Sequence, residues 1–258
     1  MTETLRHKKV ELPTIDRLGV SAAPQEGEVN AEKVGQEWLQ VFEKNISGNN
    51  IDGILSTLTD DAWWRDLLAM TWDLRTFQGT DNIRPFLKDR LAQSQLKNFK
   101  VSFAVYEQPY DDLAWDRVHF TFENAVGSGQ GVVRLVPTKG HGGKIVWKAH
   151  NVCTSLDGLR GHPPATGPLR DFDPNHGKWL EQRRRQMEYA DRDPEVLVVG
   201  GGQSGLEVAA RLKLLGVPTL VIEKQARIGD QWRHRYAALC LHDVVCEYPS
   251  PAQAVPSS

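Results

Sequence analysis

The sequence has few cysteines, little net charge and no long hydrophobic run. Its three cysteines are an odd number and too few for a disulfide framework, so we expect reduced thiols. The net charge of −2 gives no bulk attraction to nucleic acid or to an anionic membrane. No stretch approaches the roughly 18 apolar residues of a membrane-spanning helix, and residues 1–16 lack the apolar core of a signal peptide. These absences predict a cytoplasmic protein without a nucleic-acid or membrane partner.

The cysteines do not predict a metal site either. Cys240, His242 and Cys246 lie close together in the sequence, but they lack the spacing of zinc ligands. What is present is the composition of an ordinary globular protein, with 40% hydrophobic and 25% charged residues. At roughly 100–200 residues per domain, a chain of 258 residues suggests about two domains.

The first half of the chain predicts an α+β domain over residues 30–156. Residues 1–29 are polar, with scattered proline and glycine, and predict a flexible N-terminal arm. Apolar residues then recur at helical spacing in 31–45, and further helices are expected over 51–58 and 80–91. From residue 99 the period changes to two. This alternation predicts strands over 99–107, 113–124, 130–137 and 144–156. Helices followed by antiparallel strands are typical of the α+β class.

A second region begins after a linker and a helix, which we expect over residues 157–193. Glu195–Val199 has the continuous apolar character of a parallel strand buried on both faces. The glycines that follow satisfy the spacing G-x-G-x-x-G at Gly200, Gly202 and Gly205. The first permits a tight turn, the second lets a pyrophosphate approach the backbone, and the third lets the next helix pack closely on the strand.

The residues after this motif strengthen its interpretation as a dinucleotide site. An amphipathic helix follows, and its N-terminus offers unpaired N–H groups and a positive dipole end to phosphates. The next strand, Pro218–Ile222, ends in Glu223. An acidic residue about 20 positions past the glycines hydrogen-bonds the ribose hydroxyls of an adenine dinucleotide. All five features, from the first strand to the acidic residue, therefore indicate a dinucleotide-binding site.

Two resemblances follow from these features. The order of elements over Ala31–Ser155 resembles the NTF2-like or SnoaL-like cone, in which helices pack across a strongly curved sheet that encloses a pocket. Gly229-Asp230-Gln231-Trp232 resembles the Gly-Gly-x-Trp turn of flavin-dependent monooxygenases of the flavin-containing and Baeyer–Villiger type, with Asp230 in place of the second glycine. Arg235-Tyr236 and Leu239–Asp243 extend that resemblance, and fungal-type members carry an NTF2-like domain in front of the flavin domain.

The monooxygenase resemblance implies FAD as the cofactor and NADPH as the hydride donor. It implies that the glycine turn, with Gln203 and Ser204, holds the FAD pyrophosphate and that Glu223 binds the adenosine ribose. Lys224, Gly229 and Trp232 would lie along the cofactor, and His242 would lie near the flavin. The alternatives are core packing for Trp232 and a structural role for His242. No catalytic residue is assigned.

Some motifs of the family are missing from the sequence. A second G-x-G-x-x-G for NADPH and a Phe-x-Gly-x-x-x-His type fingerprint are absent, and residues 244–258 are a low-complexity tail. We therefore expect residues 194–243 to form a partial, Rossmann-type FAD-binding domain in a truncated chain. By itself that chain would neither retain FAD tightly nor oxidise NADPH.

The predicted function is that of an FAD-binding oxidoreductase for NADPH- and O2-dependent oxygenation of a small organic substrate. One alternative is an NTF2-like module for ligand binding or homodimerisation, with a vestigial nucleotide motif. Another is a SnoaL-like cyclase or isomerase, which needs an acid–base pair in the cone. Its candidate residues are Asp66, Asp73, His119 and His150. The alternation of His150 with Val146 and Lys148 indicates a solvent-facing side chain.

Overall fold

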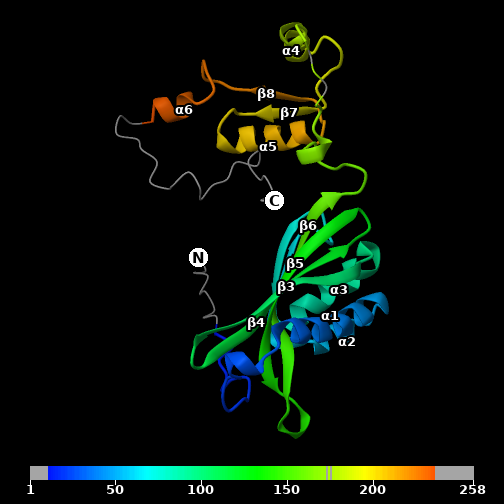
Figure 1. Cartoon of the computed structure of the whole chain (residues 1–258), viewed down its shortest axis with the longest axis vertical. Coiled ribbons are helices and arrows are strands. Elements are labelled where there is room, and N and C mark those ends of the chain that lie inside the picture. Colours follow the sequence, from blue (N-terminus) through cyan, green and yellow to red (C-terminus); the bar gives the residue numbers. More distant parts are fainter. Residues whose placement is uncertain (1–10, 173, 175, 236–258) are drawn as a thin grey trace, which may run out of the picture. The chain divides into compact units, whose positions relative to one another are not determined.

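The structure is a computed structural model in which residues 11–172, 174 and 176–235 are described. The chain forms two compact units, residues 1–160 and 161–258 (Figure 1). The boundary falls at the start of the stretch rich in proline and glycine.

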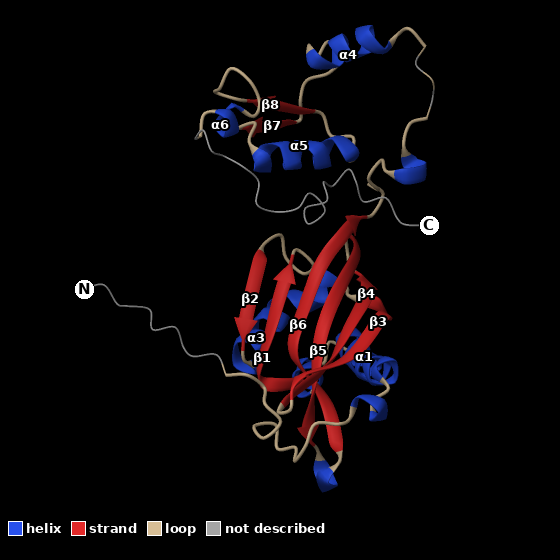
Figure 2. Ribbon diagram, turned by 60° about the vertical axis from the view of Figure 1, so that its left-hand side comes forward, coloured by secondary structure: helices blue, strands red, loops and turns tan. Residues whose placement is uncertain are grey.

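The N-terminal unit is a six-stranded sheet with helices on one side (Figure 2). The strand order is β2-β1-β6-β5-β4-β3, and all neighbours are antiparallel except β1 and β6, which are parallel. Its helices are α1 (Ala31–Ser47), α2 (Ile51–Ser56) and α3 (Thr80–Ser94), with 3₁₀ turns at Glu26–Glu28 and His141–Gly143. Its strands are β1 (Leu58–Leu67), β2 (Leu74–Gln78), β3 (Lys97–Tyr110), β4 (Leu113–Glu123), β5 (Gly127–Lys139) and β6 (Ile145–Leu159). This confirms the α+β class and the packing of helices across the sheet that the NTF2-like resemblance implied.

The face of the sheet that carries the helices is filled by aromatic side chains. Helix α1 begins at Asn30, whose side chain accepts a hydrogen bond from the Lys33 amide at 3.0 Å. Its buried stripe includes Trp38 and Phe42, whose rings stack at 4.7 Å between centroids. Phe42 also contacts the fully buried Trp64 of β1 at 5.9 Å. The interior of the N-terminal unit is therefore a packed core along these residues.

Residues 11–29 do not form the flexible arm that their composition predicted. Ile15 is only 4% exposed and joins a second buried cluster with Ala23, Tyr106 and Ala114. The Ile15 amide donates to the carbonyl of Asp112 at 2.8 Å, and the Tyr106 hydroxyl donates to a backbone carbonyl of the same segment at 2.7 Å. The segment has no regular period because it runs as turns over the sheet, so its buried residues gave no recognisable pattern.

The C-terminal unit contains a βαβ segment of the Rossmann type. It consists of β7 (Val196–Val199), α5 (Gln203–Leu214) and β8 (Thr219–Ile222), and the two strands pair in parallel. Helix α4 (Trp179–Met187) and a 3₁₀ turn (Gly167–Leu169) precede it, and the short helix α6 (Asp230–Arg233) follows it. The predicted Rossmann-type strand, turn, helix and second strand are thus confirmed. The prediction that the first strand is buried on both faces is wrong: Leu197 and Val199 of β7 are 56% and 78% exposed, because in the described part of the unit the sheet has only two strands and one face of β7 stays uncovered.

Candidate functional site

The turn between β7 and α5 has the geometry that its glycines predict. Gly200 has φ +107°, a backbone conformation that side chains with a Cβ disfavour. Gly202 is the N-cap of α5, so the next three backbone N–H groups have no partner within the helix. A Cβ at Gly205 would lie 1.9 Å from the carbonyl oxygen of Gly200 and 3.3 Å from a methyl group of Val198. Gly205 therefore allows α5 to begin directly against the strand.

Glu223 lies beside this turn. Its carboxylate accepts hydrogen bonds from the amides of Gln225 at 2.9 Å and of Gly201 at 2.7 Å. These two bonds lower the pKa of Glu223, that from Gln225 most strongly, so the side chain stays ionised. The acidic residue is thus fixed as a hydrogen-bond acceptor next to the end of α5 that attracts anions.

A cavity of about 510 Å³ opens at this place, within the usual size of small-molecule sites. Five of the predicted site residues line it: Gly202, Gln203, Glu223, Lys224 and Trp232. Sequence reasoning missed three others, namely Gln225, Gln231 and Arg235. Gln231 directly precedes Trp232, and Arg235 follows it three residues later. Their closeness in sequence to a predicted cofactor residue could have indicated both of them.

The remaining predicted residues lie around the cavity or beyond the described part of the chain. Gly200 and Gly205 shape the turn, and Ser204 is exposed on the first turn of α5. Gly229 begins α6 with φ +89°, a left-handed conformation that favours glycine. His242 lies outside the described residues. The predicted cofactor-binding residues that the structure describes thus all lie in the stretch from the end of β7 to α6 of the C-terminal unit.

Asp230, which replaces the second glycine of the family turn, holds α6 in place. It is 2% exposed, accepts a hydrogen bond from the Arg227 amide at 3.1 Å and pairs with the Arg233 guanidinium at 2.7 Å. Trp232, two residues after Asp230, is 38% exposed and lines the cavity. The guanidinium carbon of Arg235 lies 5.4 Å from the Trp232 ring centroid, a cation–π arrangement.

The four acid–base candidates of the N-terminal unit are not brought together. Asp66 is buried, and its carboxylate accepts hydrogen bonds from the Thr154 hydroxyl at 2.7 Å and from a backbone amide at 3.1 Å. Burial raises the pKa of Asp66. Asp73 is exposed and pairs with a neighbouring arginine, and His119 lies against another arginine and a phenylalanine ring. Within the described part of the unit they form no joint acid–base site.

His150 is 5% exposed, which corrects the prediction of a solvent-facing side chain. The register of β5 against β6 pairs Arg134 with Asn151 and Leu135 with Ala149, which leaves His150 as the extra residue of a β-bulge. A bulge interrupts the alternation of the two faces. The simple period of two therefore failed at this residue.

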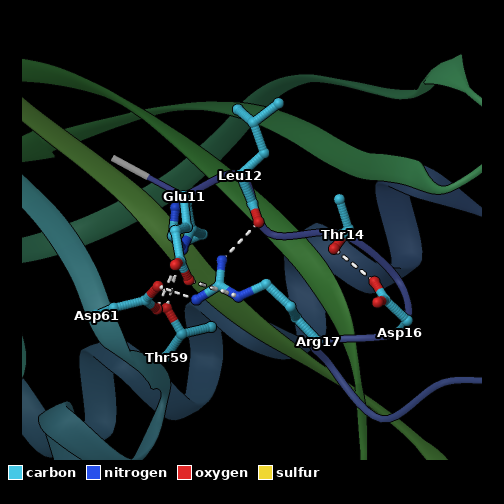
Figure 3. A network of polar contacts seen from close by, with 8 residues as sticks. Glu11, Leu12, Thr14, Asp16, Arg17, Thr59 and Asp61 are labelled. Atoms are coloured by element: carbon cyan, nitrogen blue, oxygen red, sulfur yellow. Dashed lines mark hydrogen bonds and ion pairs between the residues drawn. The ribbon is translucent and has the colours of Figure 1, made fainter. Parts of the chain in front are cut away.

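The N-terminal segment takes part in the contacts around His150. The Thr59 hydroxyl lies 3.1 Å from His150 Nδ1, and Asp61 Oδ1 lies 3.5 Å from the same atom. Arg17 reaches Asp61 at 3.0 Å and also donates to the carbonyl of Leu12 (Figure 3). Burial lowers the pKa of His150, although the charge of Asp61 opposes this shift. His150 is thus held neutral at the sheet surface beneath this segment.

His150→Gln is expected to reduce the loss of stability of the N-terminal unit at acid pH. Because the pKa of His150 is lowered on folding, the unfolded chain binds a proton that the folded chain does not, once the pH falls below about 6.5. The wild type therefore loses more stability than the variant between about pH 8 and about pH 5.5. Urea denaturation at both pH values measures this, and equal losses in the two proteins would contradict it.

The C-terminal segment is similar to known proteins. Residues 198–256 match the family described as an NAD(P)-binding Rossmann-like domain. The chain is 44% identical over 59 residues to the indole-3-pyruvate monooxygenase YUCCA1 of Oryza sativa subsp. japonica, which covers 22% of this chain and 14% of that protein. It is 43% identical over 47 residues to an uncharacterised CzcO-like oxidoreductase of Geobacillus kaustophilus, which covers 18% of this chain and 14% of that protein. The matches confirm the resemblance of the C-terminal segment to oxidoreductases of the monooxygenase type.

Solved structures with some likeness to the chain include two with NTF2 in their names. An NTF2-like protein from Pseudomonas putida aligns with a TM-score of 0.37 and 15% identity, over 55% of this chain and 96% of that one. Nuclear transport factor 2 from Cryptosporidium parvum aligns with a TM-score of 0.38 and 12% identity, over 53% of this chain and 98% of that one. None of the helices in the described part of the chain is long and apolar enough to cross a membrane.

Proposed function

We propose that the C-terminal unit binds the ADP moiety of FAD and that the chain serves a flavin-dependent monooxygenase reaction on a small organic substrate, with NADPH and O2. One observation carries this proposal. The Glu223 carboxylate is bonded to the Gly201 amide, which places an acceptor for ribose beside the turn suited to a diphosphate. The cavity between them contains both kinds of group.

The groups around the cavity fit an adenosine diphosphate. The free N–H groups at the start of α5 and its dipole bind the diphosphate, while Glu223 accepts hydrogen bonds from ribose hydroxyls. Lys224 and Arg235 add positive charge to the same wall, and Trp232 offers a flat apolar surface. FAD, when bound, supplies the redox and oxygen chemistry, and the protein supplies binding and orientation.

Because the chain spans 14% of the length of the relatives named above, the activity of a complete monooxygenase is itself part of the proposal. The groups described at the cavity recognise the ADP end of the cofactor. We therefore propose that this chain alone binds ADP and FAD with similar affinity and does not oxidise NADPH. We also propose that two copies of the chain associate through the N-terminal unit. The cyclase alternative has less support, because aromatic rings fill the helix-covered face of the sheet and its four candidate residues lie apart.

Titration of the ¹⁵N-labelled protein with ADP is expected to shift the backbone amide signals of Gly201–Gly205. Glu223→Gln should weaken binding of ADP and of adenosine by about tenfold, because a charged acceptor for ribose hydroxyls becomes neutral. Glu181→Gln on the exposed helix α4 is the matched control and should bind like the wild type. Absence of shifts at the turn, or unchanged affinity of Glu223→Gln, would refute the proposed site.

A further inference from the structure

Gln231 lies opposite the glycine turn, although the glycine motif itself does not include it. A Cβ placed on Gly202 would lie 3.2 Å from Gln231 Nε2 and 3.9 Å from its Cδ. The carboxamide therefore stands directly over the Cα of the residue that caps α5. That residue is glycine in the motif so that a pyrophosphate can approach the backbone.

The carboxamide of Gln231 is available for a ligand. In the described part of the chain no hydrogen bond joins it to another group, whereas Gln203, which also lines the cavity, donates to Glu207 at 3.3 Å. Gln231 is also half-buried, so a large part of its surface is already removed from water. A partly buried amide without a partner loses hydrogen bonds to water and gains from a ligand that replaces them.

The position of Gln231 is fixed by its neighbours. Gly229 starts α6 in a left-handed conformation, and its carbonyl accepts a hydrogen bond from the Trp232 amide at 3.0 Å. Asp230, next to Gln231, is buried and paired with Arg233 at 2.7 Å. The side chain thus projects from an anchored turn, so little ordering is needed when a ligand binds.

We propose that the Gln231 carboxamide donates a hydrogen bond to the diphosphate of the bound nucleotide and so closes the phosphate site from the side opposite α5. This inference rests on the proposed function. An amide offers two N–H donors without a formal charge, in a wall where Lys224 and Arg235 already provide positive charge. Gln231 thereby selects for the diphosphate rather than for the nucleoside. The ligand class is an adenosine 5′-diphosphate, free or as part of a dinucleotide.

The test compares the affinities of ADP, AMP and adenosine by the same amide titration. Gln231→Leu, of similar size, should weaken ADP about fivefold and leave adenosine unchanged, because one neutral hydrogen bond to phosphate is lost. Gln231→Glu keeps the shape but places a carboxylate against the diphosphate, so ADP should weaken by more than in the leucine variant. Adenosine should bind Gln231→Glu within about twofold of the wild type, since it carries no phosphate.

Gln186→Leu, on α4, is the matched control and should leave all three affinities unchanged. If the wild type binds no ADP at the turn, the proposed function fails. If the wild type binds ADP but Gln231→Leu and Gln231→Glu bind it equally well, the role of Gln231 is refuted while the site stands. Equal weakening of ADP and adenosine would also refute it, because the side chain would then shape the cavity rather than contact phosphate. The dispersion of the amide signals verifies that each variant is folded.

Discussion

Gly205→Val is expected to abolish ADP binding, with a loss in affinity of more than about 100-fold. The first atom of any side chain at this position would lie 1.9 Å from the carbonyl oxygen of Gly200 and 3.1 Å from its carbonyl carbon. These are backbone atoms of the turn, so no rotamer change relieves the clash. The helix must move away from β7, and its free N–H groups move with it. The phosphate site and its distance to Glu223 are then lost together.

The measurement for Gly205→Val combines binding with local structure. Amide signals of β7, α5 and β8 should change strongly, while those of the N-terminal unit, which folds around its own core, should keep their positions. Ala210→Val is the control, because it adds the same branched side chain at an exposed position of the same helix. Its effect on stability should stay within about 0.5 kcal/mol. Wild-type affinity in Gly205→Val would show that the turn does not bind the nucleotide.

The sequence predicted those parts of the site that follow from local geometry. Gly200, Gly202 and Gly205 have fixed roles because a strand, a tight turn and a helix must follow one another within a few residues. Glu223 could be predicted because the length of the intervening helix sets its distance from the turn. Gln231 could not be predicted in this way. Its place depends on the left-handed Gly229 and on the buried Asp230, which are features of tertiary packing.

The N-terminal unit shows the same limit. The helical and alternating periods predicted the α+β class, because each element buries one face. His150 escaped the prediction because a bulge shifts its strand by one residue. Ile15 escaped it because a segment made of turns has no period, although Ile15 is buried in a cluster with two residues of the sheet, Tyr106 and Ala114. The periodicity of the sequence therefore does not predict bulges or packed turns.

Asp116 is a buried carboxyl group that the proposed function does not use. It lies on β4, paired with Tyr106 of β3 and Leu135 of β5, and is fully buried. Neither of its carboxylate oxygens has a hydrogen-bond partner among the described residues. Burial, with a smaller effect of the charge of Glu107, raises the pKa of Asp116 to about 7. The carboxyl group is therefore protonated in the folded unit over much of the range in which an unfolded aspartate is ionised.

Asp116→Leu is expected to stabilise the N-terminal unit at pH 8 by up to about 4 kcal/mol. Between about pH 4 and pH 7 the folded wild type holds a proton that the unfolded chain releases, so its stability falls as the pH rises through this window. Above about pH 7 both states are ionised and the penalty stays constant. Leucine has a similar volume and neither titrates nor needs a hydrogen bond. Asp116→Asn removes the titration but retains an unpaired polar group, so it should be stabilised less.

Urea denaturation of the wild type and both variants at about pH 5 and about pH 8 separates the two effects. Asp66 and His150 titrate in all three proteins, so the difference between wild type and variant isolates Asp116. The difference should grow from pH 5 to pH 8 for both variants, because only the wild type carries the ionised carboxylate at the higher pH. At pH 5 roughly a third of the ionisation penalty is already present, so the difference should be small but favourable for asparagine and larger for leucine. Parallel pH profiles in all three proteins would mean that Asp116 is ionised in the folded unit and finds a partner there.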